Sequence, residues 1–204
     1  IGSAVLEAGD KSIVVGRDGR THSPDIAEQL IEGILTTGCH VVNIGMVPSP
    51  IVYYAIAELD STNSGVIITA SHNPAEYNGF KIVINNEALA GDKIQDLRIR
   101  ISQQKFASGS GREDFSELTA EYIDRIFSDV ALAGELSVVI DAGNGVAGKI
   151  ATQLFRELGC NVTPLFCDID GTFPNHEPDP SVPENLRQLI NMVKEVEADI
   201  GIAL

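Results

Sequence analysis

Short β-branched runs alternate with amphipathic stretches along the whole chain, and this alternation predicts an α/β fold. In the first half, strands are expected over residues 12–16, 40–44, 65–69 and 80–84. The stretches between them space their apolar residues as helices do. Because strands and helices take turns in this way, we expect mostly parallel sheets that carry helices on both faces.

The first predicted helix carries its own start and stop signals. Ser23 is the expected N-cap, and Pro24 suits the first helical position. Asp25 and Glu28 bring negative charge to the positive end of the helix dipole. Gly38 is expected to end the helix before the next strand. A second helix is predicted from Pro48 to about residue 59, and a third over residues 94–101.

The second half repeats this pattern after a small, polar, glycine-rich stretch at 107–112, which is the best linker candidate. A helix through residue 132 precedes a strand at 138–140, a helix at 146–158, and strands at 162–166 and 200–204. Val14-Val15 followed by Gly38-Cys39-His40-Val41 corresponds to Val138-Val139 followed by Gly159-Cys160-Asn161-Val162. The repeat indicates either two duplicated domains or an order of elements that is common to α/β proteins in general.

The expected fold is therefore two similar domains, at residues 1–108 and 109–204, each with a mixed, mostly parallel sheet and helices on both faces. The second domain is expected to be incomplete, because an apolar parallel strand ends the chain and nothing follows it. The chain also opens at Ile1 without a methionine or a cap signal. We expect it to be a piece of a longer protein.

Composition limits the class of partner. The 204 residues carry a net charge of −15, which would repel nucleic acid and anionic membranes. The three cysteines show no disulfide or zinc spacing, although Cys160 and Cys167 are close enough in sequence to pair. No apolar run approaches the roughly 20 residues of a membrane span. The expected location is the cytoplasm.

The densest group of reactive side chains lies just past the strand at 65–69, where open α/β sheets place their ligands. Ser71 offers a hydroxyl, His72 an imidazole and Asn73 an amide, and Lys81 follows as a cation that burial would bring into acid/base range. The alternative is a surface turn with a strand-end lysine. A serine hydrolase is disfavoured, because adjacent residues tend to point apart and no nucleophile-elbow motif is present.

A second candidate is the turn Arg17-Asp-Gly-Arg20, which precedes the start of a helix. Two guanidinium groups, backbone amides and a helix N-terminus together suit an anion. The alternative is a solvated turn in which Asp18 pairs with an arginine.

A third pattern, Gly143, Gly145 and Gly148, matches the dinucleotide-binding spacing, with Asp168 twenty residues after Gly148. Against it, Asp141 stands where the strand should end apolar, and Asp168 begins a polar loop that runs to Pro180. That loop contains His176, Glu177 and Asp179, but its prolines and spacing favour a rigid surface loop over a metal site.

Several motifs in register resemble the α-D-phosphohexomutases. They are T-A-S-H-N-P with N-G-F-K, V-G-R-D-G-R, G-M-V-P-S-P-I-V-Y-Y-A, D-A-G-N-G-V-A-G and F-P-N-H-E-P-D-P, and the last is similar to the bacterial phosphomannomutase/phosphoglucomutase branch. The resemblance covers the whole chain. It implies an isomerase that interconverts hexose 1-phosphate and 6-phosphate of glucose or mannose, with a hexose 1,6-bisphosphate as the intermediate.

The resemblance also implies roles for single residues. Ser71 matches the serine that carries the phosphoryl group, and through its phosphate it would contact Mg²⁺. His72 and Asn73 would position the phosphoserine and the reacting groups, and Lys81 would act as a general acid/base or stabilise charge. Arg17 and Arg20 would support the same cleft.

Two family segments are absent, and their absence shapes the expectations. The resemblance places an arginine-bearing stretch before Ile1, and the aspartates that hold Mg²⁺ directly after Leu204. By itself the chain is therefore expected to be inactive or nearly so. Two other readings stay open: a dinucleotide-binding module built on Gly143, Gly145 and Gly148, and a non-catalytic protein that binds sugar phosphates or a partner.

Overall fold

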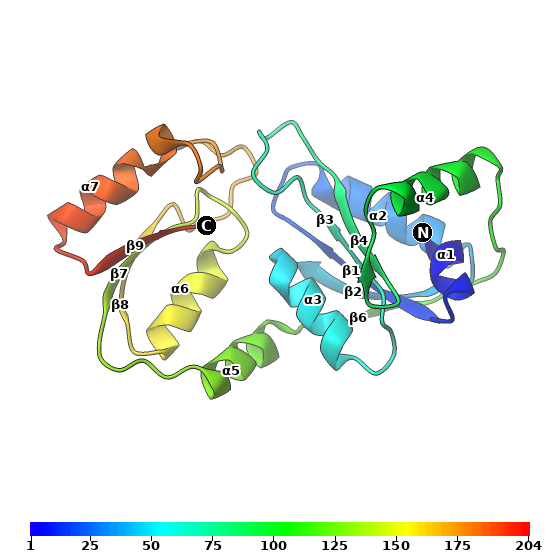
Figure 1. The fold of residues 1–204 in the computed structure, drawn as a ribbon, viewed down its shortest axis with the longest axis horizontal. Helices are drawn as coiled ribbons and strands as arrows, with labels where there is room; N and C mark the ends of the chain where they lie inside the picture. Colours follow the sequence, from blue (N-terminus) through cyan, green and yellow to red (C-terminus); the bar gives the residue numbers. More distant parts are fainter. The chain divides into compact units, whose positions relative to one another are not determined.

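The computed structural model describes residues Ile1–Leu204, and the chain divides into two compact units (Figure 1). The first unit contains residues 1–18, 22–69 and 79–118. The second contains residues 19–21, 70–78 and 119–204. Two short pieces from the first half of the chain, one after the first strand and one after the third, thus belong to the second unit.

The first unit is built on a six-stranded sheet in the order β5-β4-β3-β1-β2-β6. Its central strands β1 (Ser12–Arg17), β2 (His40–Met46) and β3 (Gly65–Ile68) are parallel, as is the edge strand β6 (Glu113–Phe115). Strands β4 (Phe80–Ile84) and β5 (Glu87–Ala88) run antiparallel to their neighbours. The helices are α1 (Gly2–Glu7), α2 (Ser23–Leu35), α3 (Ser49–Glu58) and α4 (Asp92–Ser102).

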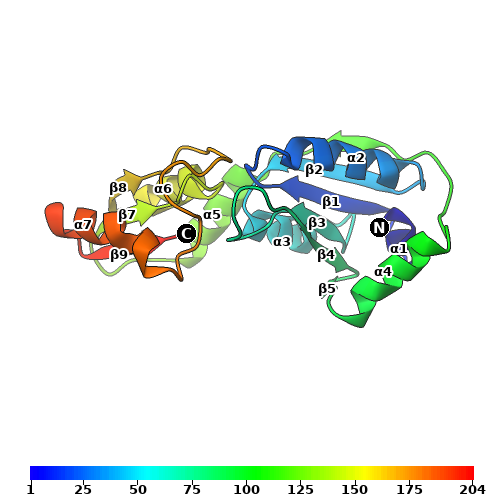
Figure 2. The same cartoon turned by 90° about the horizontal axis from the view of Figure 1, so that it is seen from above.

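Helices cover both faces of this sheet because the strands β1 and β3 are apolar on both sides. One face packs Val15 and Ile68 against α2 in a core that also takes apolar residues of α1 and α4. Helix α3 contacts the same two strands and lies on the opposite side of the sheet from α2 (Figure 2). Strand β1 has five buried residues in succession, as expected for a strand at the centre of a parallel sheet.

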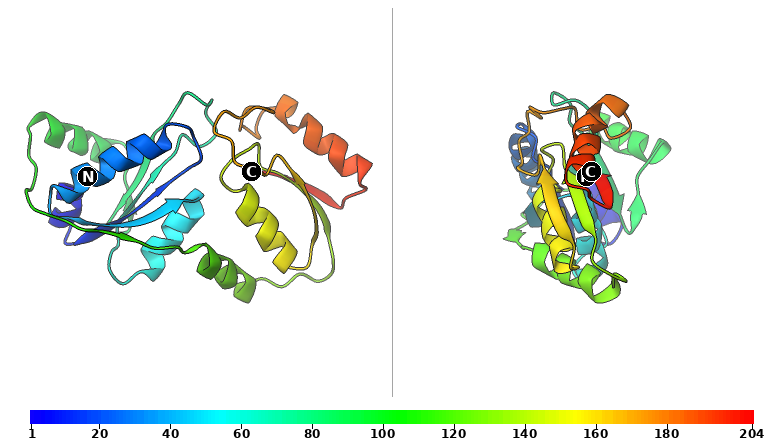
Figure 3. Two further views of the ribbon diagram at one scale, coloured as in Figure 1. Left: turned by 180° about the vertical axis from the view of Figure 1, so that it is seen from behind. Right: turned by 90° about the vertical axis from the view of Figure 1, so that its left-hand side faces the viewer.

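The second unit has a three-stranded parallel sheet in the order β8-β7-β9. Its strands are β7 (Ser137–Asp141), β8 (Asn161–Leu165) and β9 (Ile200–Ala203). Helix α6 (Gly148–Glu157) contacts β7 and β8, and α7 (Arg187–Glu195) contacts β7 and β9 from the other face (Figure 3). Helix α5 (Thr119–Asp129) packs on α6, and the 3₁₀ helix η1 (Pro183–Leu186) leads into α7.

The predicted fold class is confirmed: both sheets are mostly parallel and both carry helices on their two faces. Five elements were not predicted, namely α1, β5, β6, η1 and α7. The cap of α2 was predicted wrongly, because the N-cap is His22 and the Ser23 hydroxyl instead donates a hydrogen bond of 2.6 Å to Asp18 Oδ1. The polar loop before α6 extends further than expected, to Ala147.

The glycine-rich stretch at 107–112 packs closely against the end of α2. The amides of Gly109 and Gly111 donate to the carbonyl oxygens of Thr36 and Leu35 at 2.9 and 2.8 Å. A Cβ on Gly111 would lie 2.1 Å from the Cys39 carbonyl oxygen, so only glycine fits there. The stretch then continues into β6, which pairs with β2.

Two further structural facts bear on the predictions. None of the helices is long and apolar enough to cross a membrane. Cys39, Cys160 and Cys167 are all free thiols, so the possible Cys160–Cys167 pair is not formed.

Candidate functional site

The loop of residues 70–78 begins two residues beyond the end of β3 and carries Ser71 near its start. Ser71 is exposed, and its φ of 56° lies in the left-handed region that non-glycine residues rarely adopt. Within the loop, the amide of Asn73 donates to the Ala70 carbonyl and that of Tyr77 to the Pro74 carbonyl, each at 3.1 Å. Ser71 is therefore presented at the surface by a loop with its own turns.

Arg20 holds this loop from within. It is 2% exposed, and its guanidinium donates to four carbonyl oxygens of the loop. The distances are 3.0 Å to Ser71, 2.7 Å to Asn73, 2.6 Å to Pro74 and 3.2 Å to Tyr77. Hydrogen bonds from a charged group are stronger than those between neutral groups, and several together stabilise an unfavourable backbone conformation such as that of Ser71.

The ring of Phe173 completes the surroundings of Arg20. The guanidinium carbon lies 5.0 Å from the ring centroid, within the range of a cation–π contact. Because carbonyl oxygens already occupy this guanidinium, the geometry favours a loop-shaping role over the predicted contact with an anion. Arg17 differs: it is half-buried at the end of β1, and its Nη1 donates to the Asp18 carbonyl at 3.3 Å.

His72 and Asn73 are both exposed beside Ser71, as expected for residues that meet a ligand. The Asn73 side-chain amide donates back to the Ala70 carbonyl at 2.7 Å, which leaves its own carbonyl oxygen for other partners. His72 Nδ1 lies 2.8 Å from the carbonyl oxygen of Pro178. Nearby, the hydroxyl and amide of Ser181 lower the pKa of the Asp179 carboxyl, and the His72 imidazole adds to this.

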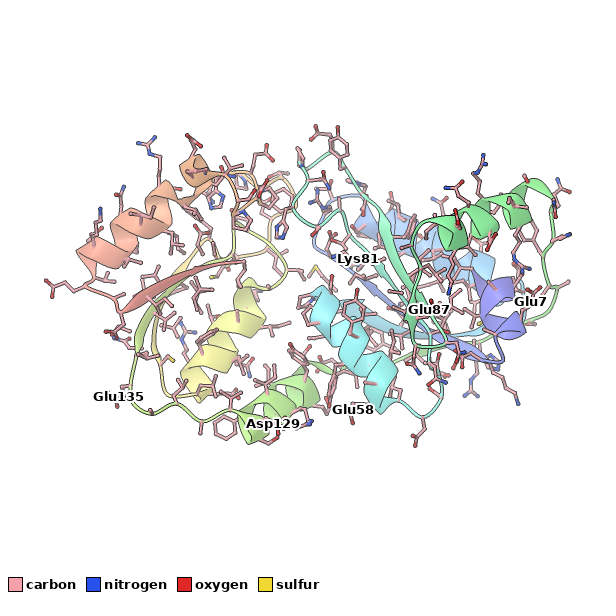
Figure 4. All side chains as sticks on the ribbon, viewed as in Figure 1. Glu7, Glu58, Lys81, Glu87, Asp129 and Glu135 are labelled. Carbon is pink, nitrogen blue, oxygen red and sulfur yellow. The ribbon has the colours of Figure 1, made fainter.

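Lys81 lies near the start of β4, opposite Ile67 of β3 (Figure 4). Its side chain is exposed, whereas the sequence-based reasoning had it buried. That part of the sequence-based reasoning was wrong, because the first residues of β4 leave the core and only Ile82 and Val83 are buried. The structure places Ser71, His72, Asn73 and Arg20 in the second unit, and Arg17 and Lys81 in the first.

The glycine loop that follows β7 is organised around a buried acid. Asp141 is the last residue of β7 and is 1% exposed; its Oδ1 accepts from the Gly143 amide at 2.9 Å. His176 Nε2 lies 3.1 Å from both carboxylate oxygens. The prediction of a surface loop at 168–180 missed this contact, because a half-buried histidine ties the loop to the strand end.

Two glycines of this loop lie close to other parts of the chain. A Cβ on Gly148 would lie 2.4 Å from the Cys167 carbonyl oxygen, and one on Gly143 would lie 3.1 Å from His176. These glycines therefore serve close packing of the chain on itself. Dinucleotide binding is not favoured.

No group of three or more His, Cys, Asp and Glu side chains in the chain could hold a metal ion. The residues around Ser71 offer a hydroxyl, an imidazole and an amide, which do not by themselves fit a Mg²⁺ site of carboxylate and water ligands. Asp170 and Asp179, the two loop acids with shifted pKa values, bond instead to Thr172 and Ser181 of their own turns, which lower those pKa values.

Sequence reasoning missed the contacts that join the loop of 70–78 to the loop of 168–180. The phrase F-P-N-H-E-P-D-P was noted as a motif, but its link to His72 was not. A histidine and a proline-rich phrase in an otherwise surface-like loop were the available signal. They gave no indication of which distant residue they contact.

Comparison with known proteins adds the family. The models of phosphoglucomutase/phosphomannomutase α/β/α domains I and II match residues 1–108 and 120–204. A phosphomannomutase/phosphoglucomutase of Pseudomonas aeruginosa is 50% identical over 203 residues, covering 100% of this chain and 44% of the relative. A phosphoglucomutase of Neisseria meningitidis serogroup B is 43% identical over 205 residues, with the same coverage of both chains.

A crystal structure from Burkholderia thailandensis, of a phosphoglucomutase/phosphomannomutase family protein, has the same arrangement of elements. It matches with a TM-score of 0.96 at 44% identity and covers 100% of this chain and 46% of that one. The chain thus spans less than half the length of these relatives.

Proposed function

Because the chain belongs to the phosphoglucomutase/phosphomannomutase family, we propose that its full-length protein interconverts hexose 1-phosphate and hexose 6-phosphate through a phosphorylated Ser71. Glucose and mannose phosphates are the proposed substrates, and a hexose 1,6-bisphosphate is the proposed intermediate. One observation supports this most strongly: an exposed serine, held in a left-handed conformation at the end of a buried strand, on a loop fixed by Arg20.

The proposed chemistry moves one phosphoryl group out and one back. In the first step the bond between Ser71 Oγ and phosphorus breaks as a sugar hydroxyl oxygen bonds to the phosphorus. The hydroxyl proton passes to a base, and Ser71 recovers its hydroxyl by taking a proton. In the second step Ser71 Oγ bonds to the phosphorus of the other phosphate as the bond from that phosphorus to the sugar oxygen breaks. The serine proton passes to a base and the sugar oxygen takes a proton, which releases the isomeric monophosphate.

Among the residues beside Ser71, we assign His72 and Asn73 to positioning the phosphoserine and the reacting oxygens. Their exposure at the same loop supports this assignment. Lys81 is proposed as a general acid/base or a charge-stabilising cation, and Arg17 as a further cation of the cleft. For Arg20 we now favour the support of the loop, for the reasons given above.

A metal cofactor follows from membership of the family, and we propose that it is Mg²⁺. The residues of this chain do not form its site, and the phosphate on Ser71 is the one ligand that they would contribute. No step above is therefore assigned to the metal.

The proposal extends to the organisation of the protein. We propose that the chain contributes two domains, expected from the sequence at 1–108 and 109–204, with the first extended to about residue 118 because β6 pairs with β2. We propose a cytoplasmic location, which the three free thiols support. The chain spans 44% of its relatives' length, and alone we expect it to lack turnover.

The test is replacement of Ser71 by alanine in the full-length protein, with Ser108→Ala as the matched control. Ser108 is also exposed, but it lies in the stretch that follows α4. We expect Ser71→Ala to lose the protein-bound phosphate seen by intact-mass measurement and to lose turnover of glucose 1-phosphate by at least about a thousandfold. Ser108→Ala should keep both.

Normal turnover by Ser71→Ala would contradict the proposal. A wild-type protein that binds hexose phosphates without turnover or phosphate incorporation would instead favour the non-catalytic sugar-phosphate-binding alternative. The two results separate an enzyme from a binding protein.

A further inference from the structure

His176 is placed so that each of its ring nitrogens meets an oxygen that accepts hydrogen bonds. Nδ1 lies 2.8 Å from the carbonyl oxygen of Glu177, and Nε2 lies 3.1 Å from both carboxylate oxygens of Asp141. A carbonyl oxygen and an ionised carboxylate have no proton to give. Each nitrogen must then carry its own hydrogen, which makes His176 an imidazolium cation paired with the Asp141 carboxylate.

A neutral pair, with the proton on Asp141, would satisfy the same distances. From the contacts of both ring nitrogens we infer the ion pair, and the NMR measurement described below distinguishes it from the neutral pair. The pair is well shielded from water, with side-chain exposures of 15% for His176 and 1% for Asp141. Asp141 is the charged group that faces His176 from β7. The ring of Phe166 lies edge-on to the His176 ring, with 5.6 Å between the two ring centroids.

This pair fastens a strap, which we define as residues 175–178, to the end of β7. The Asn175 side-chain amide adds a hydrogen bond of 2.7 Å to Asn144 Oδ1. Pro178, at the other end of the strap, is buried. The position of the Pro178 carbonyl oxygen is therefore set by contacts on both sides of the strap.

That carbonyl oxygen meets His72 Nδ1 at 2.8 Å. Since a carbonyl only accepts, Nδ1 of His72 carries the hydrogen, and a neutral His72 keeps its lone pair on Nε2. The strap thus selects which ring nitrogen of His72 is available next to Ser71. Hydrogen bonds of this outer kind commonly set the orientation of functional histidines.

We propose that His176 is a positioning residue for phosphoryl transfer: its ion pair with Asp141 holds the Pro178 carbonyl that fixes the orientation and tautomer of His72. The proposal rests on the proposed function for the role of His72. Its structural part, the charge of His176 and the tautomer of His72, stands independently of any activity.

The structural part is tested by ¹⁵N NMR of the full-length protein labelled in its histidine rings, at neutral pH. His176 and His72 are assigned from the spectra of His176→Asn and His72→Asn. We expect two protonated nitrogens in His176 and a protonated Nδ1 with a bare Nε2 in His72. A neutral His176 ring, or a His72 protonated at Nε2 alone, would overturn the proposal in the wild-type protein, whatever the variants do.

The functional part is tested by kinetics of His176→Asn and Asp141→Asn, with His22→Asn as the control. His22 is a partly buried histidine at the N-cap of α2 that makes no capping bond through its side chain. We expect kcat of His176→Asn and Asp141→Asn to fall about tenfold or more with little change in KM, while His72 becomes a mixture of tautomers. The control should keep both properties.

A His176→Asn protein that folds, keeps wild-type kcat and keeps the His72 tautomer would sink the proposal. Failure of the proposed function gives a different result, because Ser71→Ala would then retain turnover while the NMR of His176 and His72 remained as expected. The two failures are thus distinguishable.

Discussion

The two strand–helix–strand segments β1–α2–β2 and β7–α6–β8 follow the same local plan. In each, the first residue of the first strand pairs in parallel with the second residue after a glycine that follows the helix. The two glycines, Gly38 and Gly159, have φ values of 88° and 89°. Each is followed by a buried cysteine, Cys39 or Cys160. The sequence repeat therefore corresponds to a repeated structural unit.

The two segments differ where their first strands end. Each strand leads into a buried aspartate, but Asp18 accepts from Ser23, five residues away, whereas Asp141 meets His176, thirty-five residues away. The loop after each strand also holds a distant loop through a side-chain donor. After β1 the donor is the Arg20 guanidinium, which bonds to the Asn73 carbonyl, and after β7 it is the Asn144 amide, which bonds to the Asp168 carbonyl. One plan for the scaffold thus carries two different loops, and the proposed chemistry depends on the loops.

Removal of the side chains of Arg20 and Asn144 should give the largest effect on the free energy of unfolding and the clearest contrast between the two loops. Arg20→Met leaves four carbonyl oxygens without their donor, and we expect a loss of about 3–5 kcal/mol in the free energy of unfolding. Asn144→Gly keeps the left-handed backbone at φ 61° and removes neutral hydrogen bonds, so about 1 kcal/mol is expected. Urea unfolding measures both.

Equal losses for Arg20→Met and Asn144→Gly would mean that the charge of Arg20 adds nothing to the stability of its loop. Arg17→Met serves as the control for loss of an arginine. Its guanidinium makes one longer hydrogen bond, to the Asp18 carbonyl, and its loss should cost less than about 1 kcal/mol.

The helix-ending glycines test whether the repeat is structural. An alanine at a left-handed position is destabilising, so Gly38→Ala and Gly159→Ala should each lower the free energy of unfolding by about 1–2 kcal/mol. A Cβ on Gly38 would meet Gly109 at an ordinary 3.4 Å, and one on Gly159 would meet nothing within 4 Å. Similar losses are therefore expected in chemical denaturation. An unchanged free energy of unfolding in Gly159→Ala would show that the two helix ends are not equivalent.

The last expected effect appears only at alkaline pH and concerns Cys39, which directly precedes β2. Burial, with the nearby Asp10 charge, raises the pKa of the Cys39 thiol from 9.0 to about 11. Between these values the folded chain keeps a proton that the unfolded chain has lost, so stability should fall as pH rises from about 9 to 11. Cys39→Val should show a flatter dependence in urea unfolding at several pH values. An identical dependence in both proteins would contradict this account.

Sequence patterns predicted the elements whose own residues show whether they are buried. The apolar runs of β1 and β3 can only be buried strands, and a loop at their ends is a general site for ligands. Strand β6 was missed because Glu113–Phe115 is short and exposed and two of its three residues are acidic; it pairs with β2. Helix α1 was missed because six residues without a side-chain cap give no start signal.

The candidate site was predictable only where its residues are adjacent in the sequence. Ser71, His72 and Asn73 were found because they are neighbours in sequence. The roles of Arg20 and His176 were not predicted. The partners of Arg20 lie 51 to 57 residues away along the chain, and Asp141 lies 35 residues from His176. Long-range contacts of this kind leave no local pattern of spacing or charge.

The close fit of Gly109 and Gly111 against the end of α2 has a practical consequence for anyone who divides this protein. A cut after residue 108 falls inside that fit and also detaches β6 from the edge of its sheet. The trimmed piece would expose the backbone groups of β2 and invite self-association through the bared strand. A junction beyond residue 118 keeps the sheet whole and suits a shortened protein better.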